Sequence, residues 1–547
     1  MLPRRTIAAT LTCLCVGLAA PAVAQADKSQ EAMFQDDNLL IFNSIEGTNE
    51  TLDRLAALGV DSIRISVFWG TVAPSADSQQ RPANFNASDP GAYPPGNWAR
   101  YDFLVQGAGA RGMDVNFNIT SPAPKWATPN PEREDIDDTF EPRTDEFAAF
   151  VRALGTRYSG TYSPTPDGSP LPRVDFWSIW NEPNQAGWLT PQWRSDPREG
   201  RSRFFVEAAP AIYRGLVSAA WNALGQTGHG QDTILIGDLA PKGLRNNKGQ
   251  TRSIDALRFL RGMYCLDANA QFYRGDTATA RGCPAEMDPA KFVTENQGLF
   301  RASGFAHHPY ELIAAPDDKP RSRDWVTIAN LHVLQSSLRR IYARYRVPLP
   351  SKDGMPIWLT EFGYQTDPPD PTGVSPKTQA EYTNWSEYVA FTKPYVRSFS
   401  QFLLVDDKPV PGEDTSTAKA WGATFQSGLM TLDGREKPAY DAYRVGLHIP
   451  DQRLDRGEKV TVFGVLRPET RGEVRSEVQF RTRSYKGSRT NYRKRATATS
   501  GLPAHYLRRK FTARLDGWVR IKWTDAAGAE HLSRSQYIEV NDGRGRD

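Results

Sequence analysis

Strand-like apolar runs alternate with amphipathic helical segments along most of this 547-residue chain. Such alternation predicts a parallel sheet with helical crossovers, either closed into a barrel or open and doubly wound. No Gly-rich phosphate-binding fingerprint follows the first apolar run, so a dinucleotide-binding sheet loses support. Eight strand–helix pairs in about 410 residues fit a (β/α)8 TIM barrel with inserted loops. We therefore expect such a barrel over residues 25–445.

The expected elements follow from the apolar runs and the helical periodicity between them. The expected strands are 38–42, 62–68, 114–119, 174–180, 233–237, 304–307, 356–360 and 401–405. The expected helices are 48–58, 98–111, 144–158, 201–224, 253–261, 324–345, 376–399 and 438–443.

The pattern changes after residue 446, where short alternating runs dominate and no long helical period occurs. This predicts an Ig-like β-sandwich over residues 446–547. That region holds 22 Lys and Arg against 12 Asp and Glu. Such a basic domain fits contact with an anionic polymer or a cell surface, or a solvated face that docks on the barrel. The expected strands are 459–466, 474–483, 506–514, 518–523 and 535–540.

The N-terminus predicts a signal peptide over residues 1–24, and so a secreted protein. Arg4 and Arg5 precede an apolar stretch, and Ala24 ends a run of small residues suited to cleavage. A membrane anchor is the alternative, but the apolar stretch is shorter than the ~20 residues that a span needs. No other segment is apolar enough to span a bilayer. The net charge of +4 argues against a nucleic-acid partner, and we expect a monomer.

Two cysteines remain once the predicted signal peptide, with Cys13 and Cys15, is removed. In an exported protein Cys265 and Cys283 most simply form one disulfide, and two free thiols are the alternative. Two cysteines and seven scattered histidines argue against a Cys-based metal site. We expect neither a metal nor an organic cofactor.

Two apolar strands end in a glutamate. The segment from Asp175 to Asn184 places Glu182 directly after a strand that Pro183 stops, and the segment from Pro356 to Tyr364 ends its strand at Glu361. By our count these are strands four and seven. Active sites of such barrels lie at the carboxyl ends of the strands, so both side chains should meet there.

A pair of carboxyl groups facing one bond suits glycoside hydrolysis. One group must donate a proton, and the other must stay ionised to attack the anomeric carbon, so their environments must separate the two pKa values. Glu182, beside Asn181 and aromatic residues, is the expected acid/base, and Glu361 the expected nucleophile. The alternative is two structural glutamates that cap strands or pair with arginines.

These motifs carry a resemblance to a known group. Asn181-Glu182-Pro183, together with Thr360-Glu361-Phe362-Gly363, resembles the signatures of glycoside hydrolase clan A, especially the cellulase-like family five and family thirty-nine. The resemblance covers roughly residues 34–444. It implies a retaining double-displacement mechanism in a (β/α)8 barrel.

Further residues match the clan's pattern one at a time. Arg64, inside the apolar second strand, resembles the arginine that hydrogen-bonds the nucleophile and keeps it ionised. Asn181 resembles the residue that binds the sugar 2-hydroxyl. The clan's His-x-Tyr pattern falls on His308 and Tyr310, which would orient the substrate and the nucleophile. Whether His307 or His308 faces the pocket stays open, because successive strand residues face opposite sides.

Aromatic side chains are the remaining candidates for substrate binding. Trp126, after the third strand, is the expected stacking platform for a sugar ring. Many clan members carry a Trp on strand eight, whereas residues 401–407 here hold none, and Trp421 is the candidate to replace it from a loop.

Together these features predict a secreted retaining O-glycosidase that acts on a polysaccharide or an oligosaccharide. The alternatives are a non-catalytic carbohydrate-binding or cell-wall-binding protein on the same barrel, and a transglycosidase with the same residues.

Overall fold

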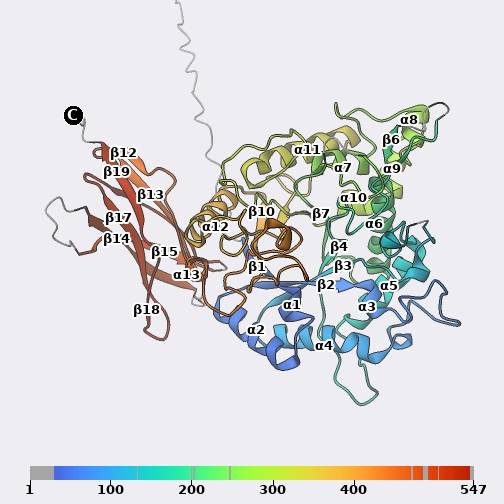
Figure 1. Ribbon diagram of the computed structural model, residues 1–547, viewed down its shortest axis with the longest axis horizontal. Coiled ribbons are helices and arrows are strands. Elements are labelled where there is room, and N and C mark those ends of the chain that lie inside the picture. Colours follow the sequence, from blue (N-terminus) through green and yellow to red (C-terminus); the bar gives the residue numbers. More distant parts are fainter. Residues whose placement is uncertain are drawn as a thin grey trace, which may run out of the picture.

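Eight parallel strands close into a barrel within the part of the chain that the computed structural model describes (Figure 1). That part is residues 30–541 without 132, 199, 201–203, 245–247, 468, 470, 471, 484–490 and 503. The strand order is β1-β10-β9-β8-β7-β4-β3-β2, which confirms the predicted TIM barrel. The barrel strands are β1 (Glu31–Gln35), β2 (Ser62–Phe68), β3 (Asp114–Thr120), β4 (Phe176–Ile179), β7 (Thr233–Leu239), β8 (Gly304–His307), β9 (Ile357–Leu359) and β10 (Val396–Phe402).

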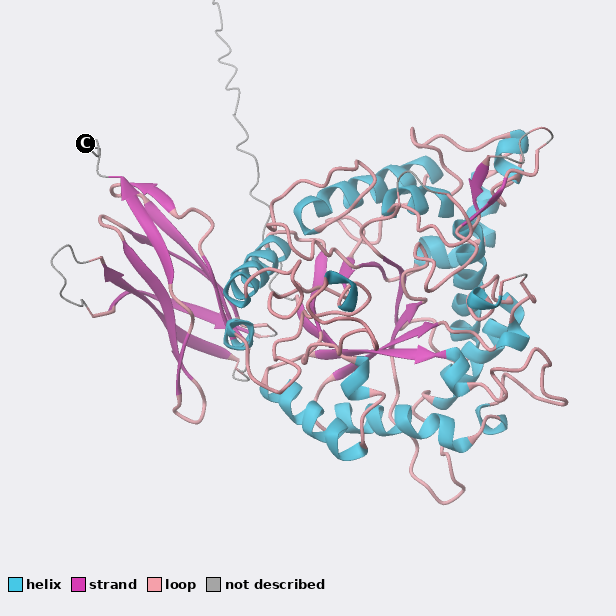
Figure 2. Cartoon of the chain, in the orientation of Figure 1, coloured by secondary structure: helices cyan, strands magenta, loops and turns pink. Residues whose placement is uncertain are grey.

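Helices surround this barrel (Figure 2). They are α1 (Asp37–Leu40), α2 (Ile45–Ala57), α3 (Trp69–Val72), α4 (Pro95–Gly109), α5 (Thr144–Arg157), α6 (Ala209–Gln226), α7 (Ala256–Met263), α8 (Gly275–Thr279), α9 (Pro289–Glu295), α10 (Gln297–Arg301), α11 (Leu331–Tyr345), α12 (Pro376–Phe391) and α13 (Pro438–Arg444). A small hairpin, β5 (Trp193–Ser195) with β6 (Phe205–Glu207), precedes α6.

The predicted first and last barrel strands are wrong in position. The apolar run at 38–42 begins inside helix α1, whose first turn Asp36 caps by accepting a hydrogen bond from the Leu39 amide. Strand β1 begins with Glu31 and ends with Gln35. Because both ends are polar, a search for apolar runs does not identify it. Strand β10 begins at Val396, inside the predicted helix 376–399, because α12 stops at Phe391.

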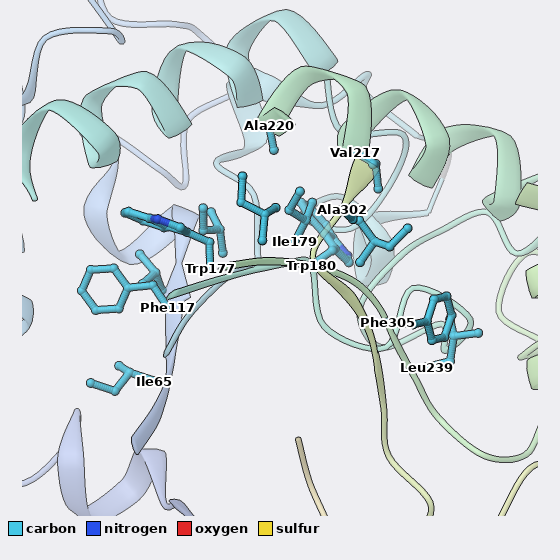
Figure 3. Packing of buried hydrophobic residues seen from close by; sticks show 14 of the residues in the cluster. Ile65, Phe117, Trp177, Ile179, Trp180, Val217, Ala220, Leu239, Ala302 and Phe305 are labelled. Atoms are coloured by element: carbon cyan, nitrogen blue, oxygen red, sulfur yellow. The ribbon is translucent and has the colours of Figure 1, made fainter. Parts of the chain in front are cut away.

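The core of the barrel domain lies between the strands and the surrounding helices. Figure 3 shows Ile179 of β4 lying beneath Val217 and Ala220 of α6. Trp177 of the same strand is fully buried and meets Phe117 of β3 edge-on, with ring centroids 5.9 Å apart. Each such buried side chain stabilises the fold by about 1.5–3 kcal/mol, which makes the strands a rigid support for the polar residues at their ends.

A disulfide joins Cys265 and Cys283 with Cα atoms 5.8 Å apart, as the sequence predicts. It links the turn after α7 to the residues after α8. The bond closes part of the long segment between β7 and β8, which holds four helices in the described residues.

The C-terminal region forms a second, all-β unit beside the barrel, as predicted (Figure 1). One sheet has the strand order β11-β13-β16, and the other has β12-β19-β17-β14-β15 with β18 paired to β17. The division of the chain at residue 446 stays a prediction. The strands are β11 (Val445–His448), β12 (Arg453–Asp455), β13 (Lys459–Leu466), β14 (Glu473–Thr482), β15 (Arg493–Gly501), β16 (Tyr506–Thr512), β17 (Gly517–Thr524), β18 (Glu530–Leu532) and β19 (Gln536–Asn541).

Helix α12 of the barrel packs against the three-stranded sheet. Phe391 of α12 contacts Phe463 and Tyr506, with ring centroids 5.0 Å away in both cases. Beside this cluster Arg467 forms a buried ion pair with Glu387, and the Tyr506 hydroxyl donates to the same carboxylate at 3.0 Å. The two units therefore share apolar and ionic contacts.

The predicted signal peptide, residues 1–24, lies outside the described residues. Among the helices that the structure describes, none has the length and apolar character needed to cross a bilayer.

Candidate active site

Glu182 and Glu361 meet at the carboxyl ends of the barrel strands. Glu182 lies three residues after β4, and Glu361 lies two residues after β9. One carboxylate oxygen from each glutamate and one ring nitrogen of His308 all lie within 4.8 Å of one another. The residues are 179 positions apart in the sequence, so the closed barrel alone brings them together.

The turn that presents Glu182 has an unusual backbone. Trp180 and Glu182 have φ angles of 67° and 36°, in the left-handed region that non-glycine residues seldom adopt. The turn is anchored by the Glu182 amide, which donates to the Asp238 carbonyl at 3.0 Å. Asn184 adds a buried amide side chain that donates to the Ala240 and Ile254 carbonyls. Such strain persists only where the surrounding contacts fix it, as they do here.

Glu361 is fixed by a close approach of the chain behind it. A Cβ atom on Gly363 would lie 2.7 Å from the Ser427 Cβ, so this position requires glycine. The Phe402 amide donates to the Phe362 carbonyl at 2.8 Å, which continues the pairing of β9 and β10 beyond the strand. The Glu361 side chain is held between these contacts with 9% of its surface exposed.

Arg64 of β2 forms a hydrogen-bonded ion pair with Glu361 inside the barrel. The Arg64 Nη1 donates to Glu361 Oε1 at 2.7 Å and also to Gln35, and its Nη2 donates to Asn181 Oδ1 at 2.7 Å. The guanidinium is fully buried, and a buried cation costs free energy unless it is paired. Asn181 accepts this hydrogen bond through its oxygen, so its side-chain amide N–H groups can still act as donors. These N–H groups have no partner among the described residues.

His308, and not His307, lies between the two glutamates. The His308 Nδ1 is 2.8 Å from Glu182 Oε1 and 3.5 Å from Glu361 Oε2. His307 points elsewhere, with its Nε2 3.0 Å from the Val326 carbonyl. Burial disfavours a charge on His308, but the Glu361 carboxylate and the hydrogen bonds to Asp238 and Glu182 outweigh burial and raise its pKa to about 9. The ring therefore carries a positive charge at neutral pH.

Asp238 at the end of β7 belongs to the same network, and the sequence analysis missed it. Its Oδ1 lies 3.4 Å from His308 Nε2 and accepts from the Thr360 hydroxyl at 2.5 Å, while its Oδ2 lies 3.4 Å from Arg64 Nη2. Burial opposes its charge, but Arg64 and His308 lower the pKa of Asp238 to about 2. The signal was present in the sequence, because a carboxyl near the end of an apolar strand needs a partner.

The two glutamates differ in their surroundings. Burial raises the pKa of Glu361 above its ordinary value, and the His308 and Arg64 cations oppose that rise. The Tyr310 hydroxyl donates to Glu361 Oε2 at 3.1 Å. Burial and the Glu361 charge raise the Tyr310 pKa, which keeps this donor protonated. Glu182 is more open, with 18% of its side chain exposed.

The two predicted tryptophan platforms lie apart from this network. Trp126 is buried, edge-on to Trp69 and Phe85, with its Nε1 donating to the Pro74 carbonyl. Trp421 is also buried, and its Nε1 donates to the Thr415 carbonyl. Neither forms a hydrogen bond or ring contact with the carboxylates in the described part of the chain.

Two phenylalanines lie beside Tyr310 near the end of β10. Phe402 ends β10 and Phe425 follows in a loop, and their ring centroids lie 6.2 and 6.1 Å from that of Tyr310. Both are half-buried. The sequence analysis missed both, since only tryptophan was sought there.

Glu182, His308 and Glu361 are also close enough to hold a divalent cation. A metal-bound histidine must be neutral, whereas the three carboxylates around His308 keep its ring protonated. A metal would have to displace that proton and the hydrogen bond to Glu182. The donor set therefore fits a proton-bearing network better than a metal centre.

No protein-family model and no curated protein sequence matches this chain. Similar solved structures were found. GH5_18 from Streptomyces cattleya, solved with GlcNAc, is 17% identical over 79% of this chain and 84% of that one, with a TM-score of 0.41. A β-glucosidase from Thermotoga maritima is 14% identical over 72% of this chain and 84% of that one, with a TM-score of 0.42.

A third similar structure, a calcium-binding mutant of Bacteroides uniformis β-glucuronidase 2, is 12% identical with a TM-score of 0.39. It matches 94% of this chain, which spans only 46% of that protein's length. The similar structures include GH5_18 and a family 1 β-glucosidase.

Proposed function

We propose that this protein is a secreted retaining glycosidase that cleaves an O-glycosidic bond of a polysaccharide or oligosaccharide by double displacement. The observation that carries the proposal is the approach of Glu182 and Glu361 to within 4.8 Å, oxygen to oxygen. Retaining glycosidases hold their two carboxyl groups about 5–5.5 Å apart, whereas inverting enzymes need about 6.5–9.5 Å to admit a water.

The surroundings of the two carboxyls support different roles. Glu361 receives hydrogen bonds from Arg64 and Tyr310, which orient it and stabilise its negative charge for attack. Glu182 receives neither, and its greater exposure suits a group that exchanges protons with water. Glu361 is therefore the proposed nucleophile and Glu182 the proposed acid/base.

In the first step a Glu361 oxygen bonds to the anomeric carbon while the glycosidic C–O bond breaks. The leaving oxygen takes its proton from Glu182. In the second step Glu182 takes a proton from water, whose oxygen bonds to the anomeric carbon and releases the Glu361 carboxylate. The Asn181 amide N–H groups and the half-buried rings of Phe402 and Phe425 are the proposed contacts to the reacting sugar.

The test is turnover of a panel of 4-nitrophenyl glycosides and wall polysaccharides, with the product anomer followed by NMR. Glu361→Ala should lower kcat at least about 10⁴-fold. Glu182→Ala should be rescued by azide, giving a glycosyl azide of retained configuration, because azide needs no proton acceptor. Glu146→Gln, in a pair with Arg81 outside this network, is the matched control and should leave turnover unchanged.

A non-catalytic carbohydrate-binding barrel is the alternative. It would bind members of the same panel without any product, and the Glu361→Ala variant would bind as well as the unchanged protein. Inverted product, or near-normal turnover by Glu361→Ala, would contradict the proposed mechanism.

A further inference from the structure

The outer face of the six-stranded sheet carries arginines between aromatic rings. Trp518 of β17 pairs with Arg481 of β14 on one side and with Tyr537 of β19 on the other. Arg520 lies two residues further along β17, on the same side as Trp518, because side chains alternate along a strand. Val519 and Ile521 point the opposite way, into the core of the sandwich.

The rings hold two guanidinium groups in place. The Arg481 Cζ lies 4.6 Å from the ring centroid of Trp518 and 5.1 Å from that of Tyr492, and the Arg520 Cζ lies 3.8 Å from the Tyr492 centroid. Stacking on an aromatic face attracts a guanidinium and fixes its plane while its N–H edges stay available. The shared ring keeps the two groups within about 9 Å of each other.

The carboxylates of this sheet do not neutralise these two arginines. Glu477 lies 3.4 Å from Lys494, and Glu539 lies 3.7 Å from Arg453. Among the described residues, neither Arg481 nor Arg520 forms an ion pair with a carboxylate. The Arg520 Nε donates to Gln479 Oε1 at 2.9 Å, which orients its guanidinium further.

This face is turned away from the barrel. The three-stranded sheet takes the contacts with helix α12, and the core of the sandwich separates the two sheets. Arg481, Arg520, Trp518, Tyr492 and Tyr537 are all partly exposed. These side chains are therefore partly accessible to a large ligand even while the barrel is docked, with the Arg481 Nε itself buried and the Arg520 Nε paired to Gln479.

We propose that Arg481 and Arg520, held by Trp518 and Tyr492, form a binding site for a carboxylate-bearing polysaccharide. A guanidinium held flat presents a fork of N–H donors that matches a carboxylate with two parallel hydrogen bonds. Two fixed groups suit successive acidic sugars, whereas affinity for duplex DNA depends on neutralising many phosphates at once. The choice of a polysaccharide rests on the proposed glycosidase function.

The experiment measures binding of the full-length protein to polygalacturonate by calorimetry, with a neutral galactan as reference. Glu361→Ala is present in every variant to prevent digestion of the polymer. Arg481→Gln with Arg520→Gln should weaken binding to polygalacturonate at least tenfold. Arg508→Gln with Arg509→Gln removes the same charge from exposed positions of β16 and should change the affinity less than threefold.

Several results would overturn the proposal. Equal binding of the galactan, or an equal loss in both pairs of variants, would show that the face does not recognise carboxylates specifically. Tighter binding of duplex DNA or of phosphatidylserine vesicles would assign it to another partner. Melting temperatures and turnover of a small glycoside, measured with Glu361 intact, should match in all variants. If the protein with Glu361 intact turns over no glycoside of the panel, while the binding that depends on Arg481 and Arg520 is found, only the proposed function is refuted.

Discussion

Two buried clusters of basic and acidic side chains in this molecule differ in their balance of charge and in their exposure. At the domain contact Arg467 pairs with one carboxylate, Glu387, and both side chains are 1% exposed. At the barrel mouth Arg64 and His308 face three carboxylates, one of which, Glu182, is 18% exposed. The first cluster balances its charges one to one, whereas the second holds more negative than positive charge and opens toward solvent.

This difference separates a structural ion pair from a site able to do chemistry. A balanced, closed pair has no group left to bind a ligand, and removing one partner leaves an uncompensated buried charge. An unbalanced, open cluster shifts the pKa values of its members and keeps a group free to react, which is typical of active sites. Burial alone does not distinguish the two clusters.

The largest expected contrast comes from shortening each arginine in turn. Arg64→Lys keeps the charge but loses the fork that reaches both Glu361 and Asn181, so kcat should fall about 10³-fold per folded molecule. Arg467→Lys should lower the free energy of unfolding by about 3 kcal/mol and leave kcat unchanged. Denaturant unfolding and turnover on the same samples measure both. A similar loss of activity in both variants would contradict the distinction between a structural ion pair at Arg467 and an active-site cluster at Arg64.

A smaller effect concerns the pH dependence of stability. The pKa of His308 is raised to about 9 in the folded protein, against about 6.5 in an unfolded chain. The bound proton therefore stabilises the fold fully below about pH 6.5, and this contribution, about 3 kcal/mol, is lost as the pH rises through 9. Urea unfolding between pH 6 and 10 should show this decline. His308→Gln should remove it, and an unchanged slope in that variant would refute the assignment.

The smallest expected effect tests the charge surplus itself. Asp238→Asn removes one of the three carboxylates around His308, so the pKa of His308 should fall by about one unit, which corresponds to about 1.4 kcal/mol. NMR titration of the ring measures this. The matched control is Asp232→Asn, which removes a carboxylate 2.6 Å from the ring of a different histidine, His229. That control should not move the His308 titration.

Much of the site could be predicted because it depends on strand ends. Glu182 and Glu361 follow apolar strands, and any closed parallel barrel brings such positions together. Arg64 stood out as a cation inside an apolar strand, and a buried cation requires an anion. Their roles remain predictions until the variants are measured.

The missed features depend on contacts that local patterns do not carry. Strand β1 has polar ends, and its Gln35 accepts a hydrogen bond from Arg64, so its polarity reflects the site rather than a loop. Asp238 directly follows the predicted strand 233–237, but no sequence motif marked it, and its partners Arg64 and His308 come from distant segments. Trp126 follows a strand, as a platform should, yet Trp69 and Phe85 enclose it, and packing of this kind is set by distant segments.

The docking of the two units has a practical consequence for protein engineering. A chain cut near residue 446 would lose Arg467 and Tyr506 and leave the Glu387 carboxylate without its cation, beside an uncovered apolar surface on α12. The C-terminal unit therefore cannot be moved to another protein without its contacts to α12. Grafting it onto another barrel would require transplanting the matching face of α12 as well, and a barrel prepared alone would expose Glu387 and Phe391 to solvent.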